Sequence, residues 1–135
     1  MSAAANFLEN KLLDHVLGVA TYSQPSTIYL GLFKNVSTNA AANLEAGTLS
    51  DEVSGGSYAR KAITFGASSA GSASNDSTVT FDTASADWGT IEYVAIMDAA
   101  TSGEVLFYGP VTTAKEILAG DTFQVSGGNL TISLA

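Results

Sequence analysis

The chain of 135 residues has no cysteine, one histidine, one tryptophan and only five lysine or arginine residues. Without cysteine, neither a disulfide nor a thiolate metal site can form, so folding in a reducing cytoplasm is permitted. His15 has no second histidine with which to bind zinc or to help build a catalytic triad. A metal centre and a nucleophilic enzyme are therefore poor predictions.

The sequence also lacks long apolar runs and an excess of positive charge. Nowhere do about 18 apolar residues follow one another, and the first residues lack the basic start and apolar stretch of a signal peptide. Thirteen acidic against five basic residues give a net charge of -8, which repels phosphate backbones and anionic lipid heads. We expect a soluble protein that binds neither nucleic acid nor membranes, folded as a single domain over residues 1–135.

Sequence motifs that place a nucleophile or a phosphate are missing as well, including G-x-S-x-G, G-x-G-x-x-G and G-x-x-x-x-G-K-[ST]. Asp76, Asp82 and Asp87 flank a short predicted strand and could form a weak calcium site with nearby carbonyl groups. Aspartates that accept hydrogen bonds from turn amides are the commoner case. We therefore predict no enzyme, and no catalytic, metal-binding or cofactor-binding residue.

Two further features carry one functional and one structural interpretation each. Arg60 and Lys61 form the sole adjacent basic pair, which in a predicted strand indicates a solvated or salt-bridged edge pair rather than a phosphate site. Trp88 could stack on a sugar ring and is the one candidate glycan contact. A single tryptophan just before a core strand is more often an anchor at the edge of the core.

What the chain does contain is one amphipathic helix near its start, predicted at about residues 4–18. Its apolar residues recur at spacings of three to five, which gives one apolar face; they are Phe7, Leu8, Leu12, Leu13, Val16 and Leu17. Asn6 followed by Glu9 predicts a capping box, and Gly18 a left-handed end of the helix. Ala3–Ala5 could extend the helix backwards by a turn. The apolar face must dock either on the chain's own sheet or on a neighbouring subunit.

The rest of the chain has the two-residue period of strands, interrupted by turns rich in serine, glycine and threonine. Such spacing predicts a mainly β fold, an antiparallel β-sandwich of jelly-roll type with one N-terminal α-helix. Residues of about 34–57 predict a mobile loop, which could include one short helix near 40–46, and residues 66–77 predict a second loop. The predicted strands lie at about 28–33, 58–65, 78–81, 90–98, 104–109, 111–117, 122–126 and 129–134.

The predicted central strands are apolar on both faces, in Ile91–Met97 and again in Val105–Tyr108. A sandwich strand needs only one buried face, so the second must be covered by the helix or by another subunit. From this excess we predict a homo-oligomer. The candidate contact residues are Phe7, Leu8 and Leu12 on the helix and Val94, Ile96, Leu106 and Tyr108 on the strands, with loop 34–57 beside them.

Four ordered blocks resemble a family of small tailed-bacteriophage proteins that are usually labelled tail-fibre proteins or uncharacterised virion proteins. The blocks are NFLENKLLDHVLG at 6–18, EVSGGSYAR at 52–60, ADWGT at 86–90 and LFYG at 106–109. The resemblance spans nearly the whole chain and implies a structural component of the virion, made in the host bacterial cytoplasm. It carries no catalytic residue.

The resemblance leaves the place in the particle open. The chain is too short for a long fibre and has neither heptads nor β-helical repeats. The remaining roles are a capsid cement or decoration protein and a small tail-fibre or adaptor protein. Its partners would be itself and other virion proteins such as the major capsid or tail proteins. The alternative is a carbohydrate- or receptor-binding module of the tail that uses Trp88 and tyrosines in the loops.

Overall fold

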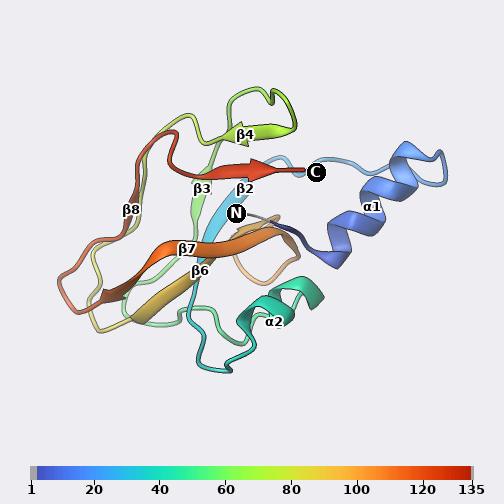
Figure 1. The fold of residues 1–135 in the computed structure, drawn as a ribbon. Helices are drawn as coiled ribbons and strands as arrows, with labels where there is room; N and C mark the ends of the chain where they lie inside the picture. Colours follow the sequence, from blue (N-terminus) through green and yellow to red (C-terminus); the bar gives the residue numbers. More distant parts are fainter. Residues whose placement is uncertain (1–2, 135) are drawn as a thin grey trace.

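The computed structural model describes residues 3–134, and strands are its main content (Figure 1). The two helices of this part are α1 (Asn6–Val16) and α2 (Ala40–Ala46). The strands, in chain order, are β1 (Ala3–Ala4), β2 (Ile28–Phe33), β3 (Lys61–Ile63), β4 (Ser72–Ser74), β5 (Val79–Thr80), β6 (Gly89–Met97), β7 (Val105–Ile117), β8 (Gln124–Val125) and β9 (Thr131–Ser133).

Five strands form the main sheet, in the order β1-β7-β6-β2-β3, with every neighbouring pair antiparallel. Strand β2 lies between β3 and β6, as its apolar residues on both faces predict. The remaining strands pair as β4 with β9 and β5 with β8. The mainly β, antiparallel, sandwich-like fold is therefore confirmed. The jelly-roll form is not, because the second layer consists of two separate two-stranded sheets.

The first hydrophobic core fills the space between the main sheet and the two small sheets. Alternate residues of β2 and β6 point into it, as the period of a strand requires, and Val125 of β8 and Ile132 of β9 pack against it from the other layer. Its buried members include Leu8, Leu30, Leu32, Val53, Ile63, Val79, Phe81, Trp88, Ile91, Val94, Ile96, Leu106 and Phe123.

A second, smaller core lies on the opposite face of the main sheet. The intervening residues of the same strands belong to it, among them Phe33 of β2 and Met97 of β6. Leu44 of α2 is buried in this cluster, and α2 packs against β7 and β6. Figure 1 shows α2 on one side of the main sheet and β4 with β9 on the other. Both faces of the central strands are therefore covered by the chain itself.

This arrangement changes the interpretation of the strands that are apolar on both faces. The second face of β6 and β7 needs neither α1 nor another subunit, because α2 supplies the cover from within the segment predicted as a mobile loop. The short helix suggested near 40–46 is confirmed, and it ends at Gly47, whose φ of +83° is in the left-handed region that glycine favours. A carboxylate holds the segment in place: Asp51 accepts hydrogen bonds from the amide and hydroxyl of Ser37 and from Asn43.

Several expectations at the element ends are wrong. Ala3–Ala4 pair with β7 instead of extending α1, and no side chain caps the helix, whose N-cap is Ala5 rather than Asn6. Strand β4 forms within the predicted loop 66–77. The turn at Leu118–Asp121 joins β7 to β8, which belong to different sheets.

Other local predictions are confirmed. Gly18 has a φ of +80°, and its amide and that of Val19 donate to the carbonyls of His15 and Asp14, which closes the left-handed end of α1. The segments predicted as strands 104–109 and 111–117 form one strand, β7, but its register against β6 jumps between Pro110 and Lys115. A second irregularity makes Leu106 an extra residue between the partners of Ile96 and Met97.

Candidate interaction surface

The strand residues that the sequence offered as contacts are buried inside one copy of the chain. Val94, Ile96 and Leu106 are only 3–9% exposed, because the layer of small sheets covers this face of the main sheet. Tyr108 is half-buried on the opposite face, where its hydroxyl donates to Glu45 of α2. Burial and this carboxylate raise the pKa of Tyr108 to about 12. None of the four is exposed on the outer surface, although Ile96 and Leu106 also line the groove described below.

Trp88 is an anchor of the core and not an exposed platform for a sugar. Its ring is buried and makes edge-to-face contacts with Tyr58 and Phe81, at centroid distances of 5.5 and 6.4 Å. Its indole N–H donates to the carbonyl of Gly56 at 2.8 Å. A buried Trp with its one donor satisfied matches the structural interpretation.

The three aspartates considered for calcium lie in separate interactions. Asp82 forms an ion pair with Lys61 at 2.8 Å, Asp87 accepts from the amide of Ala119 at 2.9 Å, and Asp76 accepts from the hydroxyl of Thr64. Within residues 3–134, no group of three or more acidic, histidine or cysteine side chains is placed to hold a metal ion. The aspartates fasten turns and neighbouring segments to one another.

Arg60 takes part in a buried ion pair. Its guanidinium donates to both carboxylate oxygens of Glu52 at 2.7 Å and to the carbonyls of Ala99 and Ser102, which fastens the β6–β7 turn to β3. Burial opposes its charge, but the bonds to Glu52 outweigh this and raise the pKa of Arg60. Tyr58 also donates to Glu52. The salt-bridged form of the edge-pair prediction is confirmed for Arg60 and for Lys61.

His15 has a structural partner as well. Its Nδ1 accepts a hydrogen bond from the amide of Tyr22 at 3.1 Å, so it fixes the segment that returns along α1. The ring of Tyr22 meets that of Phe7 edge to face, with centroids 6.4 Å apart. Residues 6–22 therefore form an ordered arm in which the return segment covers one side of the helix.

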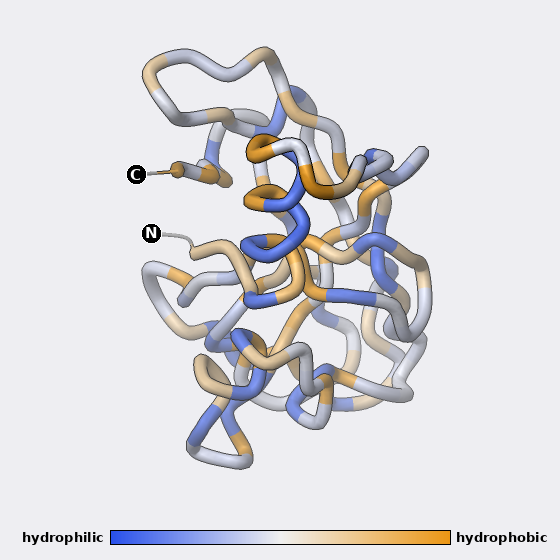
Figure 2. The backbone as a smooth tube through the Cα atoms, turned by 90° about the vertical axis from the view of Figure 1, so that its right-hand side faces the viewer, coloured by the Kyte–Doolittle hydropathy of each residue, from blue (hydrophilic) through white to orange (hydrophobic). Residues whose placement is uncertain are grey.

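The far end of this arm carries apolar side chains that the described residues leave exposed. Leu8 is buried and Leu12 partly buried, so the helix docks on its own sheet through its first half. The uncovered residues, which we call the arm stripe, are 57–76% exposed; they are Leu13, Val16, Leu17 and Val19. Figure 2, in which α1 faces the viewer, shows hydrophobic residues along one side of the helix and hydrophilic residues along the other.

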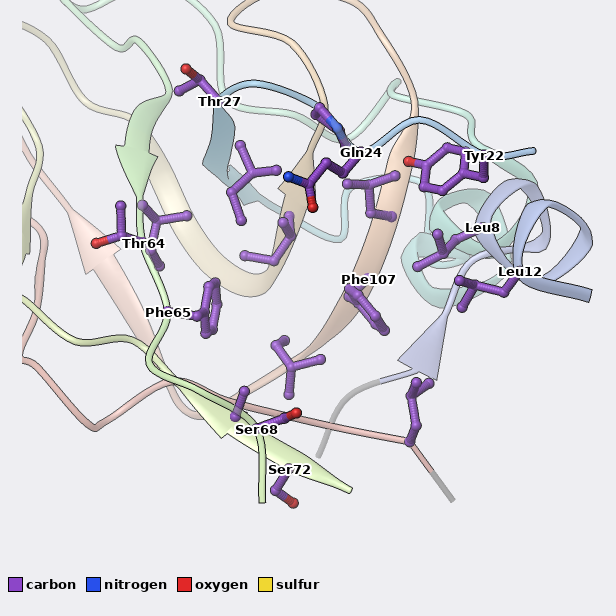
Figure 3. A pocket seen from close by; sticks show the side chains of 18 of the residues that line it. Leu8, Leu12, Tyr22, Gln24, Thr27, Thr64, Phe65, Ser68, Ser72 and Phe107 are labelled. Atoms are coloured by element: carbon purple, nitrogen blue, oxygen red, sulfur yellow. The ribbon is translucent and has the colours of Figure 1, made fainter. Parts of the chain in front are cut away.

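Beside the arm, a groove of about 750 Å³ opens between α1, β3 and the β4–β9 sheet. Leu8 and Leu12 form one wall, Phe65 lies opposite, and Phe107 lies between them (Figure 3). Among residues 3–134, no aspartate, glutamate, lysine or arginine lines it. Leu134, another exposed apolar residue, also belongs to the lining. The groove and the arm stripe are therefore neighbouring apolar surfaces of one face.

The predicted apolar face of the helix is divided in the structure. Phe7, Leu8 and Leu12 pack against the chain's own core, and Leu8 and Leu12 also line the groove. Leu13, Val16 and Leu17 of the same predicted face are exposed. Phe65 and the other groove residues come from distant segments, and no local pattern marks them.

No helix in the part of the chain that the structure describes is both long and apolar enough to cross a membrane. Residues 3–133 match the model of a family described as "Podophage GP4 fiber I protein gp80". The match covers nearly all the described residues and agrees with the resemblance to tailed-phage tail-fibre proteins. No curated protein matches the chain.

Proposed function

Since the chain belongs to the podophage GP4 fiber I protein gp80 family, we propose that it acts as a homo-oligomeric tail component that attaches to other virion proteins through apolar contacts. As a phage fibre protein it is a component of the virion with a tail-associated structural role. The finer proposal adds three features: self-association, attachment through α1 and its surroundings, and no catalysis.

The observation that carries this proposal is the uncovered arm stripe. Large apolar side chains scattered singly over a surface are ordinary, but a contiguous set on one projecting element marks an interaction site. The polar side chains considered as chemical candidates, by contrast, are engaged in structural bonds. The family supports the same kind of role, since fibre proteins work by contact.

The capsid decoration role predicted beside the tail role also requires an apolar contact, and copy number separates the two. Quantitative mass spectrometry of purified particles should give a dozen copies or fewer per virion, and labelled antibodies should bind at the tail. Hundreds of copies over the capsid would overturn the tail assignment and favour decoration.

The carbohydrate- or receptor-binding alternative is weakened at Trp88, because the ring of this residue is buried. It predicts glycan binding by the isolated protein, measured on a glycan array. Our proposal predicts no binding above background. The homo-oligomer is tested separately by light scattering after size exclusion, where a monomer at every concentration would contradict it.

A further inference from the structure

We propose that the groove between α1, β3 and the β4–β9 sheet receives the arm stripe of a second copy of this chain. The inference rests on the proposed self-association and specifies its contact. The exposed turns of one helix would fill the neighbour's groove, and the neighbour's helix would fill the first groove in return.

The groove needs an uncharged, apolar occupant. The part of its lining that residues 3–134 supply contains no charged side chain, although the chain as a whole has 18 charged residues and a net charge of -8. Two copies with this charge repel each other, so they approach at least cost where neither presents a carboxylate. A charged partner segment would lose its hydration in this groove without gaining a charged partner.

The same chain offers a fitting occupant. Among residues 3–134, seven large apolar side chains are exposed, and four of them form the arm stripe. A fifth, Leu134, lines the groove. The chain's own helix cannot supply the stripe to its own groove, because α1 already faces it with Leu8 and Leu12. A second molecule could cover the side that residues 3–134 leave open.

The exposed area favours a reciprocal contact over a one-way contact. At roughly 30 Å² per side-chain carbon, the arm stripe exposes about 300 Å² of apolar surface. One helix in one groove would then bury roughly 600 Å² in total, which is below the size of specific interfaces. An exchange in both directions doubles this to about 1,200 Å², the lower end of the stable range. A two-fold dimer is the smallest assembly that closes in this way.

The arm is ordered before it binds. The bonded left-handed turn at Gly18, the hydrogen bond between Tyr22 and His15, and the contact of Tyr22 with Phe7 hold the stripe residues in place. An ordered element loses less conformational freedom on association than a flexible tail would. A modest area can therefore suffice for the contact.

The first experiment replaces one exposed valine at a time. Val16→Glu places a charge on the arm stripe, and Val36→Glu is its matched control because the two valines are 76% and 75% exposed. We expect Val16→Glu to raise the dissociation constant of the oligomer at least about tenfold, because a carboxylate would be buried without a partner. Val36→Glu should leave it unchanged. Circular dichroism and thermal unfolding should show that both variants fold.

The second experiment uses the absence of cysteine from the chain. Val16→Cys and Ser68→Cys proteins, one of which carries a mass tag, are mixed so that their oligomers exchange subunits. The mixture is then treated with a short bifunctional thiol reagent. We expect the tagged and untagged chains to become linked, because Ser68 lines the groove. A mixture of Val36→Cys with Ser68→Cys should give no such product.

The outcomes separate this inference from the proposed function. An oligomer that survives Val16→Glu and gives no link between the Val16→Cys and Ser68→Cys chains would overturn the docking while leaving self-association intact. A wild-type chain that is monomeric at every concentration would overturn both. Loss of the oligomer in Val16→Glu together with the selective cross-link would establish the second copy as the occupant.

Discussion

At the scale of single residues, Arg60 and Glu52 form a buried ion pair in which the guanidinium donates four hydrogen bonds. The Nε and Nη2 groups of Arg60 donate to the two carboxylate oxygens of Glu52. Its Nη1 group donates to two backbone carbonyls of the β6–β7 turn. The contact joins β3, the segment before it and a turn about 40 residues further along the chain. Its role is to fix the end of the main sheet.

Glu52→Gln should lower the free energy of unfolding by about 3–5 kcal/mol, because it leaves the buried guanidinium without its counter-charge. The matched control is Asp82→Asn, which removes the exposed ion pair with Lys61 and should cost less than about 1 kcal/mol. Urea unfolding followed by the fluorescence of Trp88, the one tryptophan, measures both. Equal losses in the two variants would contradict this account of the Arg60 site.

Asp51 gives the molecule a specific response to acid. Burial opposes its ionisation, but the hydrogen bonds from Ser37 and Asn43 outweigh burial and hold its pKa below the usual value. A carboxyl with a depressed folded-state pKa stabilises the fold fully above its unfolded pKa of about 4. That contribution is lost as the pH falls from about 4 through the folded-state value.

Asp51→Asn should therefore destabilise the protein by about 1–3 kcal/mol near neutral pH, because the bonds of a charged acceptor are lost. The difference between variant and wild type should shrink as the pH falls below about 4. Urea unfolding curves at a series of pH values measure it. A difference that stays constant down to the most acid condition would contradict the assigned role of the carboxylate.

At the scale of secondary-structure elements, α2 decides how the main sheet is covered. A seven-residue helix is too short to be stable alone, so its packing on β6 and β7 must hold it. Leu44 is buried in the core that α2 closes, with Phe33 and Met97. The segment that links β2 to β3 is thus a structural cover.

Leu44→Ala should cost about 2–5 kcal/mol, the range for emptying a buried leucine site. Leu118→Ala is the control, because Leu118 is an exposed leucine in a turn and should cost about 0.5 kcal/mol or less. Chemical denaturation measures both changes. If Leu44→Ala cost no more than the control, α2 would not be the cover of the second core.

Elements with a strong repeat were predictable from sequence, and those without one were not. The helix at α1 and the strands β2 and β6 have enough turns or alternations to show their period. Strand β1, with two alanines, shows none, and β4 is a Ser-Ala-Ser segment whose pairing with β9 depends on the rest of the fold. The covering role of α2 also required knowing which way β6 faces. Intrinsic helix and strand propensities do not determine which elements pack against each other.

The candidate interaction surface was likewise predictable from the sequence only in part. Periodicity identified the apolar residues of α1, but which of them the chain itself buries depends on where the sheet ends beneath the helix. The apolar excess in β6 and β7 is present, but it does not require a neighbouring subunit, because α2 and the small sheets cover both faces. Self-association stays a prediction, now resting on the arm.

At the scale of the whole molecule, the chain closes its own core and leaves its largest apolar surface on a projecting arm. Figure 1 shows α1 extending away from the sheets, beside the end of β9. A single domain over residues 1–135 stays a prediction. The arrangement suits a virion component that must fold alone and then add to an assembly, since folding and attachment use different side chains.

Hydrogen–deuterium exchange of the wild-type protein at low and high concentration tests this division most directly. The account predicts that the protection gained on concentrating is confined to α1 and to the residues that line the groove, chiefly those around 62–73 and 130–134, with no gain in α2 or in the part of β6 before Ile96. New protection in α2 or in that part of β6, with none in α1, would show that copies meet through the central sheet and would contradict it.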